Sequence, residues 1–187
     1  DGAMSLSNNG NSTYGVTGYS NSSGNGSTDG YLMNLNDNGE LLGYFPFGTT
    51  QYEEPHDVEK VENGWVISGH AGTTDFRTHS VFLQFINENG SQGKYLTFGS
   101  QDHDGAESMV IFRDKIHIAA RSASVDPDQD VYYVKTDMNG ELLEEKWIGS
   151  EYEDPGFGLF VDAHQVLITG YSLNPVSGRK EILLLRK

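Results

Sequence analysis

The stretch Tyr14-Gly-Val-Thr-Gly-Tyr-Ser20 decides the fold, because closely similar stretches return three times along the chain. The later copies are Trp65-Val-Ile-Ser-Gly-His-Ala71, Ile116-His-Ile-Ala-Ala-Arg-Ser122 and Val166-Leu-Ile-Thr-Gly-Tyr-Ser172. The small residue in the middle of the motif stands at Gly18, Gly69, Ala120 and Gly170, which gives spacings of 51, 51 and 50 residues. A fixed period of this length is typical of a repeat protein.

Two further markers keep the same period. An Asn-Gly-type turn occurs at 36–39, 87–90 and 137–140, and Phe-Gly or Ile-Gly occurs at 47–48, 98–99 and 148–149. Each unit contains four short runs rich in Val, Ile, Tyr, Phe and Trp, bounded by Gly, Asn and Asp. In the second unit these predicted strands are residues 58–61, 65–69, 81–86 and 94–98. Asn-Gly is a strong hairpin signal, and no segment shows a helical period.

The repeat predicts an all-β protein, a β-propeller built from four four-stranded blades of about 51 residues. A single domain over residues 1–187 is expected, with blades at approximately 1–52, 53–103, 104–153 and 154–187. The last blade lacks its outer strand, because the fourth unit stops after its third strand at residues 181–187. Three assemblies remain open at this stage: a closed four-bladed monomer, part of a larger ring, and one ring completed by two chains.

The repeats also resemble a known class of sequence. The first unit carries Gly18-Tyr19-Ser20, Asp29-Gly-Tyr-Leu32, Asn36-Asp-Asn-Gly39 and Phe47-Gly48 in that order. This order is similar to the blade repeats of bacterial and archaeal secreted and cell-surface proteins. The resemblance implies a propeller scaffold in an extracytoplasmic setting (secreted, periplasmic or cell-surface) and implies no single activity. The third unit departs from the pattern, since Ala120-Arg121 replaces Gly-Tyr.

Composition excludes several classes of function. The chain has 187 residues, 12 Lys and Arg against 27 Asp and Glu, a net charge of −15 and no Cys. Nucleic acid is therefore not an expected partner, because a phosphate backbone requires clustered cations. Thiolate catalysis and thiolate-bound zinc are excluded. No apolar run approaches the ~20 residues of a membrane span, so membrane insertion is not expected.

The long connections and the blade-to-blade segments of a propeller emerge on one face, which is the predicted functional face. The segments 49–57, 100–107 and 150–156 carry nine acids and no Lys or Arg. Acids at equivalent repeat positions are expected to converge at the propeller axis: Asp1, Glu53, Asp104 and Asp154. Three roles stay open for them. They accept backbone N–H groups as structural clasps, bind a hard cation such as Ca²⁺ or Na⁺, or contact a ligand directly. No cofactor other than such a cation, Ca²⁺ above all, is expected.

Rings and polar groups in the same segments are the predicted ligand-binding residues: Tyr52, Glu54, His56, Asp102, His103, Tyr152 and Glu153. Planar rings beside hydrogen-bond acceptors suit sugars. The other histidines, at positions 70, 79, 117 and 164, show no metal-ligand spacing.

The sequence thus favours a non-catalytic binding module of a secreted or surface protein, with a cationic or neutral glycan or protein as ligand. It is expected as a monomer or as part of a larger chain. The alternative is a glycoside hydrolase or polysaccharide lyase that uses carboxylates at the axial mouth, since paired carboxylates suit general acid–base catalysis. A purely structural spacer is the third hypothesis.

Overall fold

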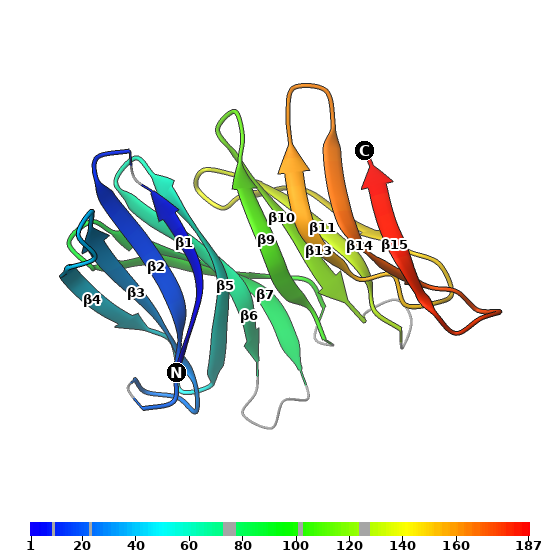
Figure 1. Ribbon diagram of the computed structural model, residues 1–187. Helices are drawn as coiled ribbons and strands as arrows, with labels where there is room; N and C mark the ends of the chain where they lie inside the picture. The colour runs from blue at the N-terminus through cyan, green and yellow to red at the C-terminus, as the bar shows by residue number, and fades with distance from the viewer. Residues whose placement is uncertain (9, 23, 73–77, 101–102, 124–127) are drawn as a thin grey trace.

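The protein is an all-β structure of four antiparallel sheets (Figure 1). The computed structural model describes residues 1–187 except 9, 23, 73–77, 101–102 and 124–127. Within the described residues there is no helix, and hence none long and apolar enough to cross a membrane. The predicted fold class, a β-propeller-type array of four-stranded units, is confirmed.

Each sheet is one sequence repeat, and each strand pairs with the next strand in the chain. The first sheet comprises β1(Gly2–Asn8), β2(Thr13–Ser20), β3(Asp29–Asn36) and β4(Leu41–Phe47), and the second β5(Tyr52–Val61), β6(Gly64–Gly72), β7(His79–Asn87) and β8(Gln92–Phe98). The third comprises β9(Gly105–Ile111), β10(Lys115–Ser122), β11(Asp130–Asp137) and β12(Leu142–Ile148). The fourth has three described strands, β13(Gly156–Val161), β14(Val166–Leu173) and β15(Lys180–Arg186), as the sequence predicts.

The Asn-Gly turns close the outer hairpins of the first three sheets. Gly39, Gly90 and Gly140 have φ values of 76°, 82° and 80°. These values lie in the left-handed region, where glycine has the lowest conformational free energy of all residues because it has no Cβ. The amide N–H of Gly39 donates to the Asn36 carbonyl oxygen at 2.9 Å, and the two later turns repeat that bond. The strongest hairpin signal in the sequence is therefore used three times.

The hydrophobic core lies between consecutive sheets. Leu32 of the first sheet packs in one buried cluster with Trp65 of the second, and Val66 of the second in another with Tyr132 of the third. A third cluster joins the third and fourth sheets. The sheets accordingly stand in a row from β1–β4 to β13–β15, with the first and last at opposite ends in Figure 1.

The inner strand of the second sheet begins earlier than predicted. The sequence places residues 49–57 in a blade-to-blade loop and starts the strand at residue 58, whereas β5 begins at Tyr52. Pro55 interrupts the pattern but not the strand. β5 lies at the inner edge of its sheet, so a residue without an N–H is tolerated where no further strand pairs with it. Glu54 and His56 are therefore strand residues rather than loop residues.

All four inner strands contain a β-bulge at the same repeat position. In β5, Pro55 pairs with Gly69 and Asp57 with Ser68, which leaves His56 as the extra residue. The corresponding extra residues of β1, β9 and β13 are Met4, Glu107 and Phe157. A bulge bends the strand and re-aims a side chain, and bulges are frequent beside active sites.

Candidate functional site

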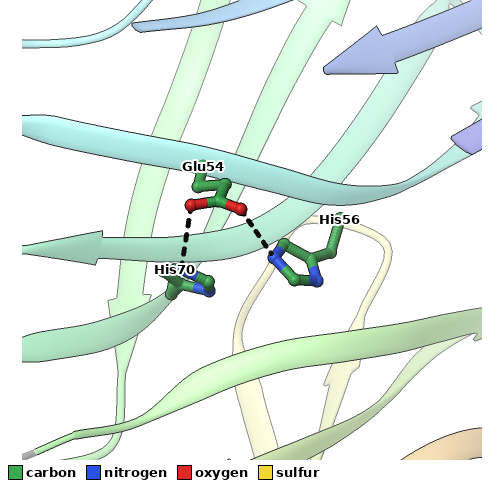
Figure 2. A group of neighbouring side chains, drawn as sticks. All are labelled: Glu54, His56 and His70. Carbon is green, nitrogen blue, oxygen red and sulfur yellow. Dashed lines mark ion pairs between the residues drawn. The ribbon is translucent and has the colours of Figure 1, made fainter. Parts of the chain in front are cut away.

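A cluster of imidazole and carboxylate groups lies at the edge of the second sheet that faces the third. Glu54 on β5 is paired across the sheet with His70 on β6, and His56 is the bulge residue two positions after Glu54. Figure 2 shows the Glu54 carboxylate between the two rings. Its Oε1 lies 3.6 Å from His56 Nε2, and its Oε2 lies 3.5 Å from His70 Nε2.

The third sheet completes this cluster. His56 Nδ1 lies 3.3 Å from Oε2 of Glu107, which is the bulge residue of β9. Arg121 on β10 forms an ion pair with the other oxygen of Glu107, its Nε lying 2.9 Å from Oε1. His56 and Glu107 occupy the same position in successive repeats, as do His70 and Arg121. The packing of the second sheet on the third thus brings His56 and His70 together with their repeat equivalents, Glu107 and Arg121, at one junction.

The cluster fixes the charge of its members. The imidazoles of His56 and His70, which lie 3.6 Å and 3.5 Å from the Glu54 carboxylate oxygens, hold the pKa of that carboxyl far below its ordinary value. The Tyr52 hydroxyl donates to the same carboxylate. Burial alone would lower the pKa of His56, but the neighbouring carboxylates of Glu107 and Glu54 outweigh it and raise that pKa to about 9. At neutral pH an ionised Glu54 therefore lies beside a protonated His56.

Two further histidines extend the cluster. The rings of His70 and His79 are 5.4 Å apart, as are those of His79 and His103, and the Nδ1 atoms of the last two lie 3.4 Å apart. Burial and the neighbouring His70, His103 and Arg121 lower the pKa of His79 to about 4, so it is neutral at pH 7. A cavity of about 200 Å³ opens here, lined by His70, His79, His103, Asp104, Gly105, Arg121 and Gln129.

A larger hollow of about 850 Å³ carries less chemistry. It lies among the tight turns that include Asn63 and Asn139, away from the long-connection face. The one ion pair described there joins Lys60 and Glu88 at 3.1 Å, and the Glu88 side chain is 67% exposed. A solvated pair of this kind contributes little. The histidine cavity is therefore the stronger candidate site.

The structure brings together four of the residues predicted to bind a ligand: Tyr52, Glu54, His56 and His103. Asp102 lies outside the described residues. Tyr152 and Glu153 belong to the next junction, where Glu153 accepts a hydrogen bond from the Tyr171 hydroxyl at 3.0 Å.

Sequence reasoning missed four members of the cluster: His70, His79, Glu107 and Arg121. Linear spacing gave no ligand motif for the two histidines, because they come from neighbouring strands rather than from one segment. The usable signal was the repeat alignment. It places His70 opposite the start of β5 and makes His56 equivalent to Glu107.

The acids proposed for the axial ring have partners of their own. Glu53, Asp104 and Asp154 are each at least 95% buried, and each accepts the backbone N–H of the residue four positions earlier, at Thr49, Ser100 and Ser150. Burial raises the pKa of Glu53 despite hydrogen bonds from Thr49. Asp1 is exposed and accepts from the Asn21 amide at 2.9 Å. These backbone bonds tie the start of one sheet to the end of the preceding one.

Comparison with known proteins identifies the fold but no family. No protein-family model matches the chain, and no curated protein sequence matches it. The catalytic domain of a GH62 α-L-arabinofuranosidase from Coprinopsis cinerea matches with a TM-score of 0.55 and 11% identity, over 100% of this chain and 64% of that one. A lignostilbene dioxygenase from Pseudomonas brassicacearum matches with a TM-score of 0.51 and 12% identity, over 88% and 42%. The chain spans less than two thirds of each.

These matches correct the functional prediction from the sequence. Both proteins are enzymes with β-propeller-type folds, and one of them is a glycoside hydrolase. The expected non-catalytic binding module is contradicted, and the alternative, a carbohydrate-cleaving enzyme, is better supported. The predicted resemblance to the blade repeats of secreted and surface proteins is supported for the fold. It is not supported by a match to any family model.

Proposed function

We propose that the chain is a carbohydrate-cleaving enzyme whose reacting groups lie in the histidine cavity. The observation that carries the proposal is the set of groups in this cavity: a neutral His79, His103 3.4 Å from it, and the guanidinium of Arg121. Imidazoles are the side chains that most often transfer protons in catalysis. A cavity of about 200 Å³ is below the roughly 300–1,000 Å³ of drug-sized sites, and suits a single sugar residue of a longer glycan.

The lining favours cleavage by β-elimination of a glycan that contains uronic acid. In this reaction a base removes the proton from C5, the C4–O4 bond breaks to leave a C4=C5 double bond, and the departing oxygen takes up a proton. His79 is the proposed base, His103 the proposed proton donor, and Arg121 the cation that binds the uronate carboxylate. That carboxylate would favour a protonated imidazole nearby, which raises the basicity of His79 when substrate binds.

Hydrolysis is the second candidate, because Glu54 supplies an ionised carboxylate close to the cavity wall. A glycosidase requires a second carboxyl group that is protonated before reaction. Among the residues that line the cavity, the one carboxylate is Asp104, and the Ser100 amide and hydroxyl both donate to it. The proposed uronate differs from the cationic or neutral ligand expected from the overall charge, because the cavity itself presents imidazoles and a guanidinium.

The test is incubation of the purified chain with a panel of uronate-containing and neutral polysaccharides. Ultraviolet absorbance detects unsaturated products of elimination, and a reducing-end assay detects both reactions. We expect unsaturated products, at least 100-fold fewer in His79→Ala. His164→Ala serves as the control, because His164 is an exposed turn residue outside the cavity. Reducing ends without unsaturation would favour hydrolysis, and no product from any glycan would overturn the proposed function.

The setting proposed for this activity is extracytoplasmic. Polymeric glycans are met outside the cytoplasm, and a chain with no Cys folds without disulfide chemistry in any compartment. The resemblance of the repeats to those of secreted and surface proteins supports the same placement. Glycan is then the partner, and the negative charge of −15 disfavours nucleic acid.

A further inference from the structure

We propose that Glu54, His56 and His70 bind a divalent first-row transition-metal ion, with Zn²⁺ as the reference ion. The three side chains each offer one ligand atom, and these atoms lie within 4.8 Å of one another. The site rests on their geometry and stands independently of the reaction proposed for the cavity.

The spacing of these atoms is close to that of a tetrahedral site. Nitrogen and oxygen ligands lie about 2.0–2.2 Å from Zn²⁺, so two ligands of one tetrahedral ion are about 3.4 Å apart. Oε1 of Glu54 lies 3.6 Å from His56 Nε2, Oε2 lies 3.5 Å from His70 Nε2, and one ligand atom from each residue lies within 4.8 Å of the other two. Side-chain rotations that draw the two imidazoles toward one oxygen would bring all three ligands to bonding distance.

The strand geometry fixes the three ligands in place. Glu54 and His70 are directly opposed on paired strands, and the bulge in β5 directs His56 to the same carboxylate. Ligands on strands hold their positions better than ligands on loops. The carboxylate is seen between the two rings in Figure 2.

The surroundings of His56 match those of a metal-bound histidine. A ligating imidazole commonly uses one ring nitrogen for the metal and holds a carboxylate with the other. His56 directs Nε2 toward Glu54 and holds Glu107 with Nδ1 at 3.3 Å, while Arg121 binds the far oxygen of Glu107 at 2.9 Å. Glu107 and Arg121 thus orient the His56 ring so that its Nε2 faces Glu54.

Two ring nitrogens of the proposed ligands are buried without a hydrogen-bond partner among the described residues. These are His56 Nε2 and His70 Nδ1, and the side chain of His70 is only 8% exposed. Buried polar atoms in native proteins almost always have a partner, so an exception calls for an explanation. A metal ion between Glu54 and His56 would satisfy the first of these atoms.

The ligand types select the class of ion. Two imidazoles and one carboxylate suit Zn²⁺ and its neighbours in the first transition series, whereas Ca²⁺ and Mg²⁺ prefer oxygen ligands alone. Three protein ligands leave at least one position open, as in catalytic rather than structural zinc sites. His70 is also part of the cavity wall, so an ion held by it would lie beside the cavity.

The test uses the full chain after chelator treatment, titrated with ZnCl₂ by calorimetry and with CoCl₂ by visible absorption. We expect one ion per chain and the intense d–d bands of a four-coordinate Co²⁺ site. Glu54→Gln and His70→Asn should each weaken Zn²⁺ binding at least 100-fold, and Glu107→Gln should weaken it about 10–100-fold. His164→Asn is the matched control and should bind as wild type does.

Circular dichroism and thermal unfolding confirm that each variant is folded before its affinity is compared. Absence of Zn²⁺ binding by the folded wild-type chain would overturn the proposal. Binding that survives in both folded Glu54→Gln and His70→Asn would place the ion elsewhere and overturn it equally. These measurements need no substrate, so their outcome is separate from that of the glycan assay.

Discussion

Replacement of Asp104 tests whether the repeated acids act as structural clasps. Its side chain is buried to 1% exposure and accepts both the amide and the hydroxyl of Ser100. Ser100 follows the outer strand of the second sheet, and Asp104 precedes the inner strand of the third. The two hydrogen bonds therefore connect consecutive sheets at the point where the chain passes between them.

The magnitude follows from those bonds. A hydrogen bond to a charged group contributes about 1.5–3 kcal/mol, and a buried donor left without a partner costs about 1–3 kcal/mol. We expect Asp104→Ala to lower the free energy of unfolding by about 2–4 kcal/mol, or roughly 5–15 °C in Tm for a domain of this size. Asp104→Asn keeps an acceptor oxygen, so its loss should be about 1 kcal/mol. Asp1→Ala is the control and should cost less than about 0.5 kcal/mol, because Asp1 is exposed.

Urea unfolding followed by tryptophan fluorescence measures these differences, with and without CaCl₂. A clasp predicts the losses above and no gain from Ca²⁺, since the carboxylate is already hydrogen-bonded. A calcium site predicts stabilisation of wild type by about 2.7 kcal/mol at 100 times Kd, absent in Asp104→Asn. An Asp104→Ala variant as stable as wild type would refute the clasp.

Three further outcomes are expected. Burial, Lys135 and Lys187 lower the pKa of His117 to about 4, so only the unfolded chain gains this proton between pH 6.5 and 4. This proton should lower the free energy of unfolding by about 1–3 kcal/mol over that window. His117→Gln should remove that part of the fall and leave the part due to His79, whose pKa is also lowered to about 4. Trp65→Ala should cost about 3–5 kcal/mol in urea unfolding, because the ring is 2% exposed. His56→Met should cost about 2–4 kcal/mol in urea unfolding, because it leaves the buried carboxylate of Glu107 without His56. Adding Glu107→Phe should recover part of that loss, and equal losses in both variants would contradict this reasoning.

The fold was predictable because its signals are local and repeated. Asn-Gly turns and apolar strands recur with one period. In the structure the turns close hairpins, and the apolar faces of the strands form the core. The start of β5 was not predictable in the same way. Pro55 and the run of acids read as a loop, and only the edge position of β5 makes a strand acceptable there.

The site was predicted in part, for a similar reason. Glu54, His56 and His103 were singled out because they stand in the blade-to-blade segments, which is a feature of the linear sequence. The contact between His56 and Glu107 depends on how the second sheet packs on the third and on a bulge in each inner strand. Neither a bulge nor a sheet-to-sheet contact is marked by a residue pattern in the sequence, since the four bulge residues are of different types.

The bulge explains how one repeated scaffold carries chemistry at a single junction. Its backbone recurs in all four inner strands, but the extra residue is Met4, His56, Glu107 or Phe157. Met4 and Phe157 are 42% and 40% exposed, whereas the side chains of His56 and Glu107 are each 12% exposed and face each other. A buried ionic cluster seldom stabilises a fold relative to apolar packing. Since the first and fourth repeats place apolar residues at this same position, the folding of the repeat does not require ionic ones, which supports the proposal that the ionic pair at the second junction serves a function.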